Sequence, residues 1–369
     1  MSGKLLMAAA GSGKTTFLVQ EALKITDGKV LITTFTESNE REVKSKFIEL
    51  AGYIPSNITI MTWFSFLIQQ GVKPYQSYLY LDKVTGLLLV NQKSGLLRFY
   101  KGIPIYAKET DIAKHYFTKD GRIYSDKLSK FVCKLNNANN GLTIDRISRI
   151  YKYIFIDEIQ DLAGYDLEII QLFSQNGIYL LMVGDPRQVT YHTHEEAKNK
   201  KYCEGQIEQF IRERNIEICI DKATLNVTHH NEQHICEYAN SMYPEFMPCS
   251  AYKKDSTGHD GVFLVHATDV DAYLETYRPV QLRDSKRTNV NDNYAVFNFG
   301  DSKGLTFDRT LIYPTAPMEK WVFDHNTELQ PKSRARFYVA VTRARYSVAI
   351  IVKNTEAEIP GVSVWKREE

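Results

Sequence analysis

Cysteine is scarce in this sequence, and no two cysteines have the spacing of a metal-binding pair. The 369 residues contain five cysteines and no Cys-x-x-Cys motif. An odd number of widely spaced cysteines argues against a disulfide framework and against a structural zinc site. We therefore expect reduced thiols and a cytoplasmic protein.

Long hydrophobic runs and an excess of one charge are missing as well. No apolar run approaches the roughly 20 residues that span a membrane, and the run Leu5–Ala10 is too short for a signal-peptide core. Lys and Arg number 46 against 44 Asp and Glu, giving a net charge of +2. This balance argues against bulk coating of nucleic acid but permits a local basic channel. The sequence thus predicts a folded protein without membrane contact, with about two domains.

Short apolar runs rich in Val, Ile and Leu recur along the chain and alternate with helical patterns. They lie at 29–32, 58–61, 153–156 and 179–183 in the first half, and at 216–220, 261–265, 310–313 and 347–352 in the second. Such runs are typical of parallel strands buried on both faces, and alternation with helices indicates an α/β fold. We predict two tandem α/β units, comprising residues 1–70 with 135–215 and residues 216–369.

Residues 71–134 interrupt the first unit and differ from it in composition. The segment carries seven tyrosines, and basic residues outnumber acidic ones in its second half. We predict a small, mostly helical inserted subdomain with a mildly basic, aromatic character. A helical lid with solvated charges and a small tyrosine core is an equally acceptable interpretation.

A glycine-rich loop follows the first predicted strand and opens a helix. The sequence Ala8–Thr15 is AAAGSGKT, which departs from the pattern GxxxxGK[ST] only at Ala8. Small residues let backbone N–H groups close around phosphate oxygens, and the helix N-terminus favours their negative charge. Lys14 would neutralise the β- and γ-phosphates, while Thr15 would ligate Mg²⁺. The residues predicted to bind the nucleotide here are Ala10, Gly11, Ser12, Gly13, Lys14, Thr15 and Thr16.

Two carboxylates follow the strand at 153–156. Asp157 and Glu158 begin the sequence DEIQD, so they lie at the carboxyl end of a buried strand. Beside a phosphate loop, Asp157 would hold Mg²⁺ and its water shell, and Glu158 would accept the proton of the attacking water. Together the two motifs predict hydrolysis of a nucleoside triphosphate.

The order of the motifs resembles that of the superfamily 1 DNA helicases of the UvrD/Rep type. The matching segments are AAAGSGKT (8–15), TFTESNEREV (34–43), TWFSF (62–66), DEIQD (157–161), VGDPRQVTY (183–191), SKGLTFD (302–308) and YVAVTRAR (338–345). The resemblance implies two RecA-like domains with ATP hydrolysis at the cleft between them, and 3′→5′ movement on single-stranded DNA. ATP and Mg²⁺ are the implied ligands.

The resemblance also implies roles for individual residues. Gln188 would contact the γ-phosphate, and Arg343 would be an arginine finger that stabilises transition-state charge. The residues matching DNA contacts are Thr34, Phe35, Thr36, Thr62, Trp63, Phe64 and Ser302. Their hydroxyls and aromatic planes suit sequence-tolerant binding. By themselves, those on the first unit are equally compatible with core positions at strand ends.

Several positions depart from the family pattern. His229 and His230 stand where relatives carry a tyrosine that stacks on adenine and an arginine that touches the γ-phosphate, so Arg287 could be needed as a substitute. Thr306 replaces a glutamate just after Gly304, which we assign to the nucleotide site. We also expect no room for an adenine-recognition segment before the phosphate loop, for the large second insertion, or for an appended nuclease.

Two hypotheses follow from these observations. The first is a compact ATP-driven translocase or helicase acting on single-stranded DNA. The second is a regulatory, DNA-sensing ATPase subunit that works with a separate nuclease in repair or anti-phage defence, as UvrD-like subunits of Gabija-type systems do. The small insertions and His230 motivate the second hypothesis.

Overall fold

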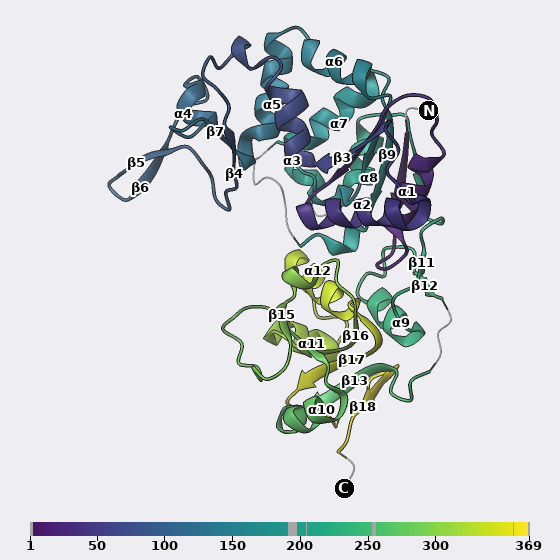
Figure 1. Ribbon diagram of the computed structural model, residues 1–369. Helices are drawn as coiled ribbons and strands as arrows, with labels where there is room; N and C mark the ends of the chain where they lie inside the picture. Colours follow the sequence, from purple (N-terminus) through teal and green to yellow (C-terminus); the bar gives the residue numbers. More distant parts are fainter. Residues whose placement is uncertain (1–2, 191–197, 204, 253–255, 357, 368–369) are drawn as a thin grey trace. The chain divides into compact units, whose positions relative to one another are not determined.

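The computed structural model describes most of the chain (Figure 1). The described residues are 3–190, 198–203, 205–252, 256–356 and 358–367. Tyr191, which ends the VGDPRQVTY motif, lies outside them. None of the helices within these ranges is long and apolar enough to cross a membrane.

The chain forms two compact α/β units, which are described separately. The first unit comprises Met1–Leu6, Thr15–Gly184 and Tyr191–Asp221. The second unit comprises Met7–Lys14, Asp185–Thr190 and Lys222–Glu369. The second unit therefore includes the phosphate loop and the residues that follow Gly184, although both are distant in sequence from the rest of it.

The first unit is built on a six-stranded parallel sheet. Its strands, in spatial order, are β10 (Ile218–Asp221), β1 (Gly3–Met7), β9 (Tyr179–Gly184), β8 (Tyr153–Ile156), β2 (Val30–Thr34) and β3 (Ile58–Thr62). Its helices are α1 (Lys14–Leu23), α2 (Glu37–Ala51), α3 (Trp63–Phe66), α5 (Leu128–Ala138), α6 (Leu142–Ile150), α7 (Tyr165–Gln175) and α8 (Ile207–Glu213). All five residues of β2 are buried, as expected of a central strand covered on both faces. The four strands predicted in the first half of the chain are confirmed.

Strand β10 corrects the predicted boundary between the units. We expected residues 216–220 to open the second unit, but β10 pairs in parallel with β1, with Gly3 opposite Ile218 and Leu6 opposite Asp221. The prediction was wrong because an apolar run indicates a strand without indicating its neighbour. The first sheet therefore gains an edge strand from beyond the predicted boundary.

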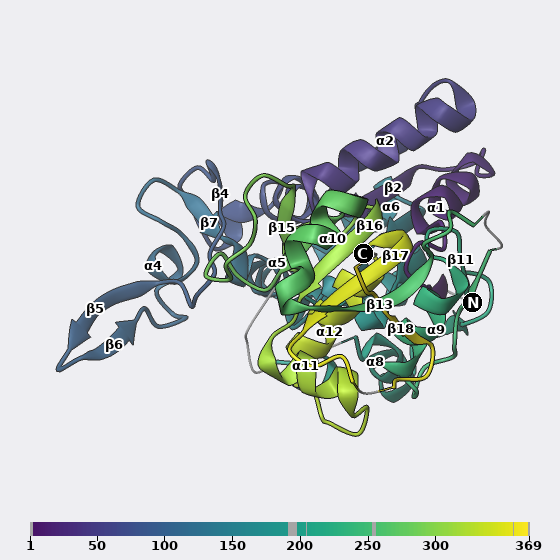
Figure 2. The ribbon, with the colours of Figure 1, turned by 90° about the horizontal axis from the view of Figure 1, so that it is seen from below.

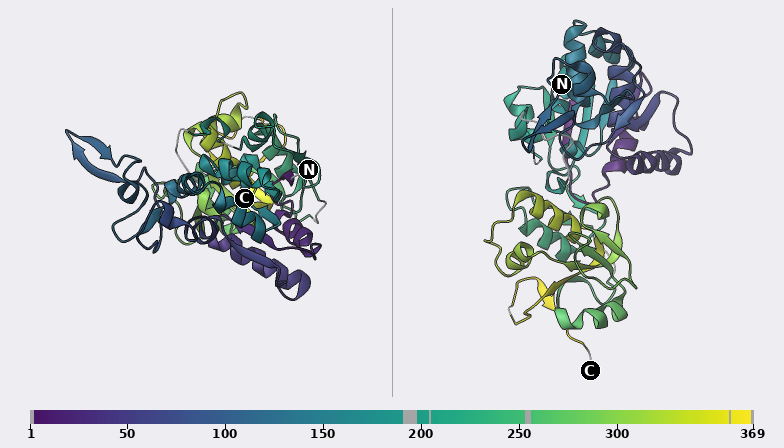
Figure 3. Two further views of the ribbon diagram at one scale, coloured as in Figure 1. Left: turned by 90° about the horizontal axis from the view of Figure 1, so that it is seen from above. Right: turned by 90° about the vertical axis from the view of Figure 1, so that its left-hand side faces the viewer.

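The inserted segment 71–134 is not mostly helical, contrary to prediction. It holds β4 (Gly86–Leu88) paired with β7 (Arg122–Tyr124), and the antiparallel hairpin of β5 (Leu96–Tyr100) and β6 (Ile103–Tyr106). Its helices are α4 (Ile112–Tyr116) and the first part of α5. In Figure 1, Figure 2 and Figure 3 the hairpin extends away from the rest of the first unit. Three of the seven tyrosines, Tyr100, Tyr106 and Tyr124, lie in these strands, where aromatic residues are favoured.

The second unit has its own six-stranded parallel sheet. Its strands, in spatial order, are β15 (Val296–Asn298), β14 (Val280–Arg283), β16 (Phe307–Tyr313), β17 (Ala344–Val352), β13 (Gly261–His266) and β18 (Val362–Val364). The remaining elements are α9 (Gln233–Ser241), α10 (Val270–Tyr277), α11 (Ala316–Phe323), α12 (Pro331–Val341), and the parallel pair β11 (Val227–Thr228) and β12 (Ser250–Ala251). Strands predicted at 261–265, 310–313 and 347–352 are confirmed.

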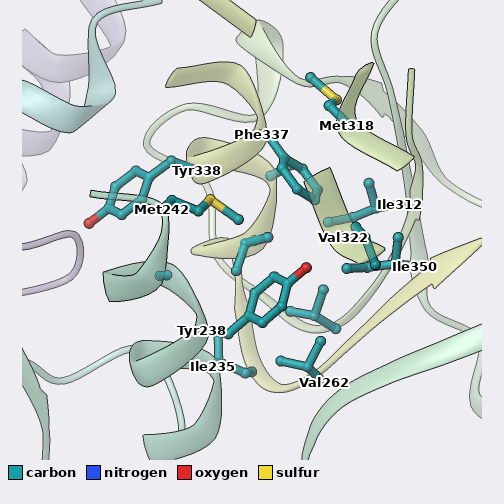
Figure 4. Packing of buried hydrophobic residues seen from close by; sticks show 14 of the residues in the cluster. Ile235, Tyr238, Met242, Val262, Ile312, Met318, Val322, Phe337, Tyr338 and Ile350 are labelled. Atoms are coloured by element: carbon teal, nitrogen blue, oxygen red, sulfur yellow. The ribbon is translucent and has the colours of Figure 1, made fainter. Parts of the chain in front are cut away.

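Helices α9, α11 and α12 contribute to one apolar core with the second sheet. Figure 4 shows Ile235 and Tyr238 on α9, Phe337 on α12, and Ile312 and Ile350 on neighbouring strands converging in it. Ala10 of the phosphate loop belongs to the same buried cluster. Burial of the alanines that precede the glycines therefore fixes the base of the loop against the second unit.

Candidate active site

The carboxyl ends of the first sheet bring several motifs to one edge. Neighbouring strands β1, β9 and β8 are followed by the phosphate loop, by Asp185 and by Asp157 respectively. Because parallel strands end at the same edge of a sheet, ligands of α/β folds bind there. The carboxyl ends of β1, β9 and β8 therefore lie side by side at one edge of the first sheet, although these strands are far apart in sequence.

The phosphate loop has the backbone that its glycines were expected to provide. Gly11 and Gly13 adopt φ angles of 68° and 81°, in the left-handed region, and α1 begins directly afterwards at Lys14. A Cβ atom on Gly11 would lie 2.6 Å from the Cβ of His230, so no other residue fits there. The Ser12 hydroxyl is buried and has no hydrogen-bond partner, which leaves it available to a phosphate oxygen.

Asp157 and Glu158 extend directly from β8. The Asp157 side chain is buried. The backbone N–H of Asp157 donates to the Thr33 carbonyl at 2.9 Å, and its side-chain Oδ1 accepts the Glu158 N–H at 2.9 Å. Glu158 has a φ of 53°, a conformation that is uncommon for residues other than glycine and recurs at functional sites. The Gln160 amide donates to the Glu158 carboxylate. This bond and the backbone geometry orient the carboxylate.

Gln160 in turn depends on a glycine at the end of β9. A Cβ atom on Gly184 would lie 2.2 Å from Oε1 of Gln160 and 2.7 Å from Cγ2 of Ile159. Any side chain at this position would displace the segment that carries the two carboxylates. Gly184 is therefore required for close approach of the strand end to the acidic motif.

A buried polar network in the second unit surrounds Asp185. The Asp185 carboxylate is fully buried and accepts hydrogen bonds from Arg187 Nε at 2.7 Å, Gln188 Nε2 at 2.9 Å and the Tyr338 hydroxyl at 3.3 Å. Arg187 also donates to the Ala8 carbonyl of the phosphate loop at 3.1 Å. Burial lowers the pKa of Arg187, but the charge of Asp185 outweighs it and raises the pKa above its usual value. The buried guanidinium therefore stays charged.

Arg343 joins this network through Gln188. Its Nη2 donates to Gln188 Oε1 at 3.4 Å, and its other nitrogens donate to the carbonyls of Val339 at 3.1 Å and Leu305 at 3.1 Å. The side chain is 5% exposed. Arg343 is thus held in one orientation in contact with the glutamine predicted to contact the γ-phosphate.

The segment 228–231 connects Arg343 to the phosphate loop. The His229 N–H donates to the Gly11 carbonyl at 2.9 Å, and His230 Nδ1 lies 3.2 Å from the Thr306 hydroxyl. The two residues that depart from the family pattern, His230 and Thr306, therefore contact each other. The exposed His229 ring packs at 5.5 Å from the ring of Tyr252.

Asn231 holds the backbone on both sides of Arg343. Its buried amide donates to the carbonyls of Thr342 at 3.0 Å and Ala344 at 2.7 Å, and its Oδ1 accepts the Thr228 hydroxyl at 3.2 Å. One side chain therefore ties the position of Arg343 to the strand that contacts the phosphate loop.

The model of the UvrD/REP helicase N-terminal domain matches residues 98–206. This range contains most of the inserted segment, the acidic motif and the Asp185–Gln188 turn. Residues 98–206 are therefore similar to this helicase domain. No curated protein matches it.

Two solved structures are similar to this chain over most of its length. One is a crystal structure of Arterivirus nonstructural protein 10 (helicase), at 14% identity and a TM-score of 0.47, covering 96% of this chain and 60% of that chain. The other is a complex of Arterivirus nonstructural protein 10 (helicase) with DNA, at 14% identity and a TM-score of 0.45, covering 95% and 60%. The chain thus spans about 60% of the length of each.

The residues predicted to contact DNA fall into two groups. Thr34 and Thr62 end β2 and β3, and the ring of Phe35, beyond β2, lies 5.6 Å from that of Phe64 in α3. The structure brings these residues together, with Thr36, at the edge where the strands end. Thr36 caps α2 and is exposed, so its hydroxyl is within reach of a ligand.

Trp63 and Ser302 are corrections to the prediction. Trp63 is 1% exposed and its indole N–H donates to Asp166 at 2.7 Å, among the rings of Phe66 and Phe173. The Ser302 hydroxyl is fully buried and donates to the Phe299 carbonyl at 2.8 Å. Both side chains are occupied inside their units, so neither is available to DNA. A buried partner distant in sequence is invisible in a short motif.

Sequence reasoning also missed several residues of the site. Asp185 and Arg187 were part of the VGDPRQ match without a role, and a buried Asp-x-Arg pair after a strand end could have indicated one. Asn231 carried no signal, because its contacts with Thr342 and Ala344 join segments about 110 residues apart.

The residues present fit a nucleotide with Mg²⁺. Within the described residues, no group of three or more His, Cys, Asp or Glu side chains could hold a metal by itself. Mg²⁺ commonly uses only one or two carboxylates together with phosphate oxygens and water. Asp157 and the Thr15 hydroxyl are of this kind, and the unpaired Ser12 hydroxyl suits the phosphates.

Proposed function

We propose that this chain is an ATP-driven translocase or helicase that acts on single-stranded DNA. The observation that carries the proposal is the contact of Arg343 with Gln188, in a network that also reaches the phosphate loop through Arg187. A guanidinium held beside a predicted γ-phosphate sensor is the arrangement that phosphoryl transfer requires. A glycine loop alone would support nucleotide binding only.

Each residue of the proposed site has a distinct task. Lys14 places a positive charge at the phosphates, and Glu158 takes the proton of the attacking water. Arg343 donates to the oxygens on which negative charge develops. Mg²⁺, when bound with the nucleotide, would be held by Thr15 and Asp157 and would neutralise phosphate charge.

Single-stranded DNA is proposed to contact the ends of β2 and β3. Thr36 is exposed and supplies a hydroxyl for a phosphate oxygen, and the half-buried Phe35 supplies a ring for a base. Thr34, Thr62 and Phe64 are buried. They position this surface, since the Thr34 hydroxyl donates to the Thr36 carbonyl at 3.2 Å and the Phe64 ring packs on that of Phe35. Hydroxyls and rings bind without reading sequence, which suits a protein that moves along a strand. The direction 3′→5′ and the choice of ATP belong to this proposal.

The decisive experiment measures ATPase rate with and without single-stranded DNA. We expect stimulation by DNA, and losses of kcat on the order of 10²–10⁴ for Lys14→Ala and Glu158→Gln and roughly 10³ or more for Arg343→Ala. Arg345→Ala is the matched control, because Arg345 is exposed and its guanidinium makes a long hydrogen bond, of 3.4 Å, to the exposed Asp308. An ATPase rate indifferent to DNA would contradict the proposal.

A DNA-sensing ATPase subunit of a nuclease complex is the second candidate. The exposed His230, where relatives place an arginine, favours it, because an imidazole lacks the permanent charge of a guanidinium. A stoichiometric nuclease that co-purifies from the native host, together with no strand separation by the isolated chain, would support this candidate over the first.

A further inference from the structure

The β5–β6 hairpin exposes apolar side chains on both of its faces. Phe99 is 65% exposed, Tyr100 58% and Ile103 66%, and Leu96 and Leu97 are also exposed. Tyr100 lies opposite Ile103, whereas Phe99 points to the other face, opposite Pro104. Contiguous exposed apolar surface of this kind marks an interaction site.

The same hairpin lies in a stretch with charge of only one sign. From Lys83 to Lys108 the sequence has five basic residues and no acidic residue. The Nζ atom of Lys93 lies 4.5 Å from the centre of the Tyr106 ring, and that of Lys101 lies 5.6 Å from the centre of the Tyr100 ring. Aromatic surface and positive charge are therefore interleaved along the hairpin.

The root of the hairpin is fixed while its tip is exposed. Lys127, which is buried, donates to the carbonyls of Ser94 at 2.9 Å and His115 at 2.8 Å, and the Ala107 N–H donates to the Gly95 carbonyl at 2.8 Å. A two-stranded hairpin is marginally stable by itself. These bonds at the root hold it in its extended position, away from the rest of the first unit in three views (Figure 1, Figure 2 and Figure 3).

The turn places a lysine at the tip. Lys101 and Gly102 have φ angles of 47° and 78°, the pattern of a two-residue type I′ turn. Asn or Asp is the usual residue at the first turn position, and lysine is uncommon there. The hairpin thus ends in a positive charge directly beside its two most exposed rings.

We propose that the β5–β6 hairpin is a second nucleic-acid contact, in which Phe99 and Tyr100 stack on unpaired bases and Arg98 and Lys101 bind phosphates. Base stacking on aromatic rings flanked by basic residues is the common mode of single-strand binding. A lipid surface would cover only one face of the hairpin and leave the opposite ring exposed. A second copy would bring two like-charged hairpins together. The inference rests on the DNA binding proposed above and names an additional surface for it.

Fluorescence anisotropy with a labelled 20-nucleotide single strand, without nucleotide, tests the proposal. The double variant Phe99→Ala/Tyr100→Ala should weaken binding about tenfold or more. Arg98→Gln should reduce the slope of log affinity against log salt by about one. Tyr53→Ala is the matched control, because Tyr53 is 62% exposed and lies outside the insertion, and it should bind as the unaltered chain does.

Unchanged affinity of the double variant would overturn the inference. So would co-sedimentation of the unaltered chain with anionic vesicles, or its dimerisation, if the double substitution abolishes either while single-strand binding persists. If the variant unfolds, cross-linking of the unaltered chain to 5-iodouracil DNA decides: adducts on Phe99 or Tyr100 support the contact, and adducts confined to 34–36 and 62–64 overturn it. An unaltered chain that binds no single strand would instead remove the proposed function itself.

Discussion

Two regions of this chain place side chains against the usual preference, one by burying charge and the other by exposing apolar surface. In the second unit, Asp185 and Arg187 are almost fully buried, and several donors converge on the carboxylate. In the insertion, Phe99 and Tyr100 are more than half exposed. Buried charge is stable only when every partner is in place, so the first region is constrained internally. Exposed rings contribute little to the stability of the fold, so the role of Phe99 and Tyr100 lies in what they bind.

Removing the carboxylate from the buried network should have the largest effect on stability. Asp185→Ala would leave Arg187 charged and unpaired inside the second unit, which costs about 3–5 kcal/mol. Asp120→Ala in the insertion removes the same kind of partner from Arg122, but that pair is exposed, at 59% and 44%, so its loss should destabilise the protein far less. Urea unfolding of both variants measures the contrast. Equal losses would show that burial does not distinguish the two regions.

Asn231 tests whether the buried network positions Arg343 for chemistry. Asn231→Ala removes both hydrogen bonds to the carbonyls that flank Arg343, and a displacement of about 1 Å typically lowers kcat on the order of a hundredfold. We expect ADP affinity to stay within about twofold, because Arg343 acts on the phosphate that is transferred.

Asn226→Ala is the matched control for Asn231, since the Asn226 amide also donates to a main-chain carbonyl, that of Pro248 at 2.8 Å. Steady-state ATPase rates and ADP titrations of the two variants distinguish positioning from general loosening. A parallel loss of kcat and ADP affinity in Asn231→Ala would argue against the positioning role.

Part of this arrangement could be predicted from the sequence. What separates the predictable features from the others is whether they depend on local or on distant residues. Near-continuous runs of Val, Ile and Leu predicted β2, β8 and β9, because central parallel strands need apolar residues on both faces. The glycines and Lys14 predicted the phosphate loop, because backbone geometry restricts the residues there. Local chemistry was sufficient in each case.

Contacts between distant segments could not be predicted in the same way. The partner of β10, the burial of Trp63 against Asp166 and the amide of Asn231 between residues 342 and 344 all join segments far apart in sequence. The hairpin is different, since two short apolar and aromatic runs separated by Lys101-Gly102 are a local signal. The prediction of a mostly helical insertion did not take this signal into account.

His230 is exposed beside Gly11 of the phosphate loop, and its replacement should have an intermediate effect. His230→Arg would supply next to Gly11 the permanent charge that an imidazole lacks. We expect a severalfold increase in DNA-stimulated kcat. Thr306→Ala is the control, since it removes only the hydroxyl near Nδ1. No gain, or a loss, in His230→Arg would mean that the missing arginine does not limit hydrolysis.

Glu109 tests the root of the exposed region, where the smallest effect is expected. Its carboxylate accepts hydrogen bonds from Lys130 at 2.9 Å, the Tyr116 hydroxyl at 3.0 Å and Lys134 at 3.2 Å. Burial alone would raise the pKa of Glu109, but these donors outweigh it and lower the pKa from 4.5 to about 2. Between these values the unfolded chain binds more protons. The contribution of the charged Glu109 carboxylate to the free energy of unfolding is therefore complete above about pH 4.5 and is lost as the pH falls through about 2.

Glu109→Gln should remove this pH-dependent contribution and loosen the root of the hairpin at every pH where the carboxylate is charged. We expect severalfold faster hydrogen exchange at amides of β5 and β6 at pH 7, with little change in global unfolding, because local opening needs less free energy than unfolding the sheets. Glu213→Gln is the matched control, as the pKa of Glu213 is likewise lowered to about 2 by Lys201 and Tyr202, on a helix outside the insertion. If exchange in the hairpin is as slow in Glu109→Gln as in Glu213→Gln, the fixed root does not hold the exposed rings in place, and the hairpin must be ordered by its own strands.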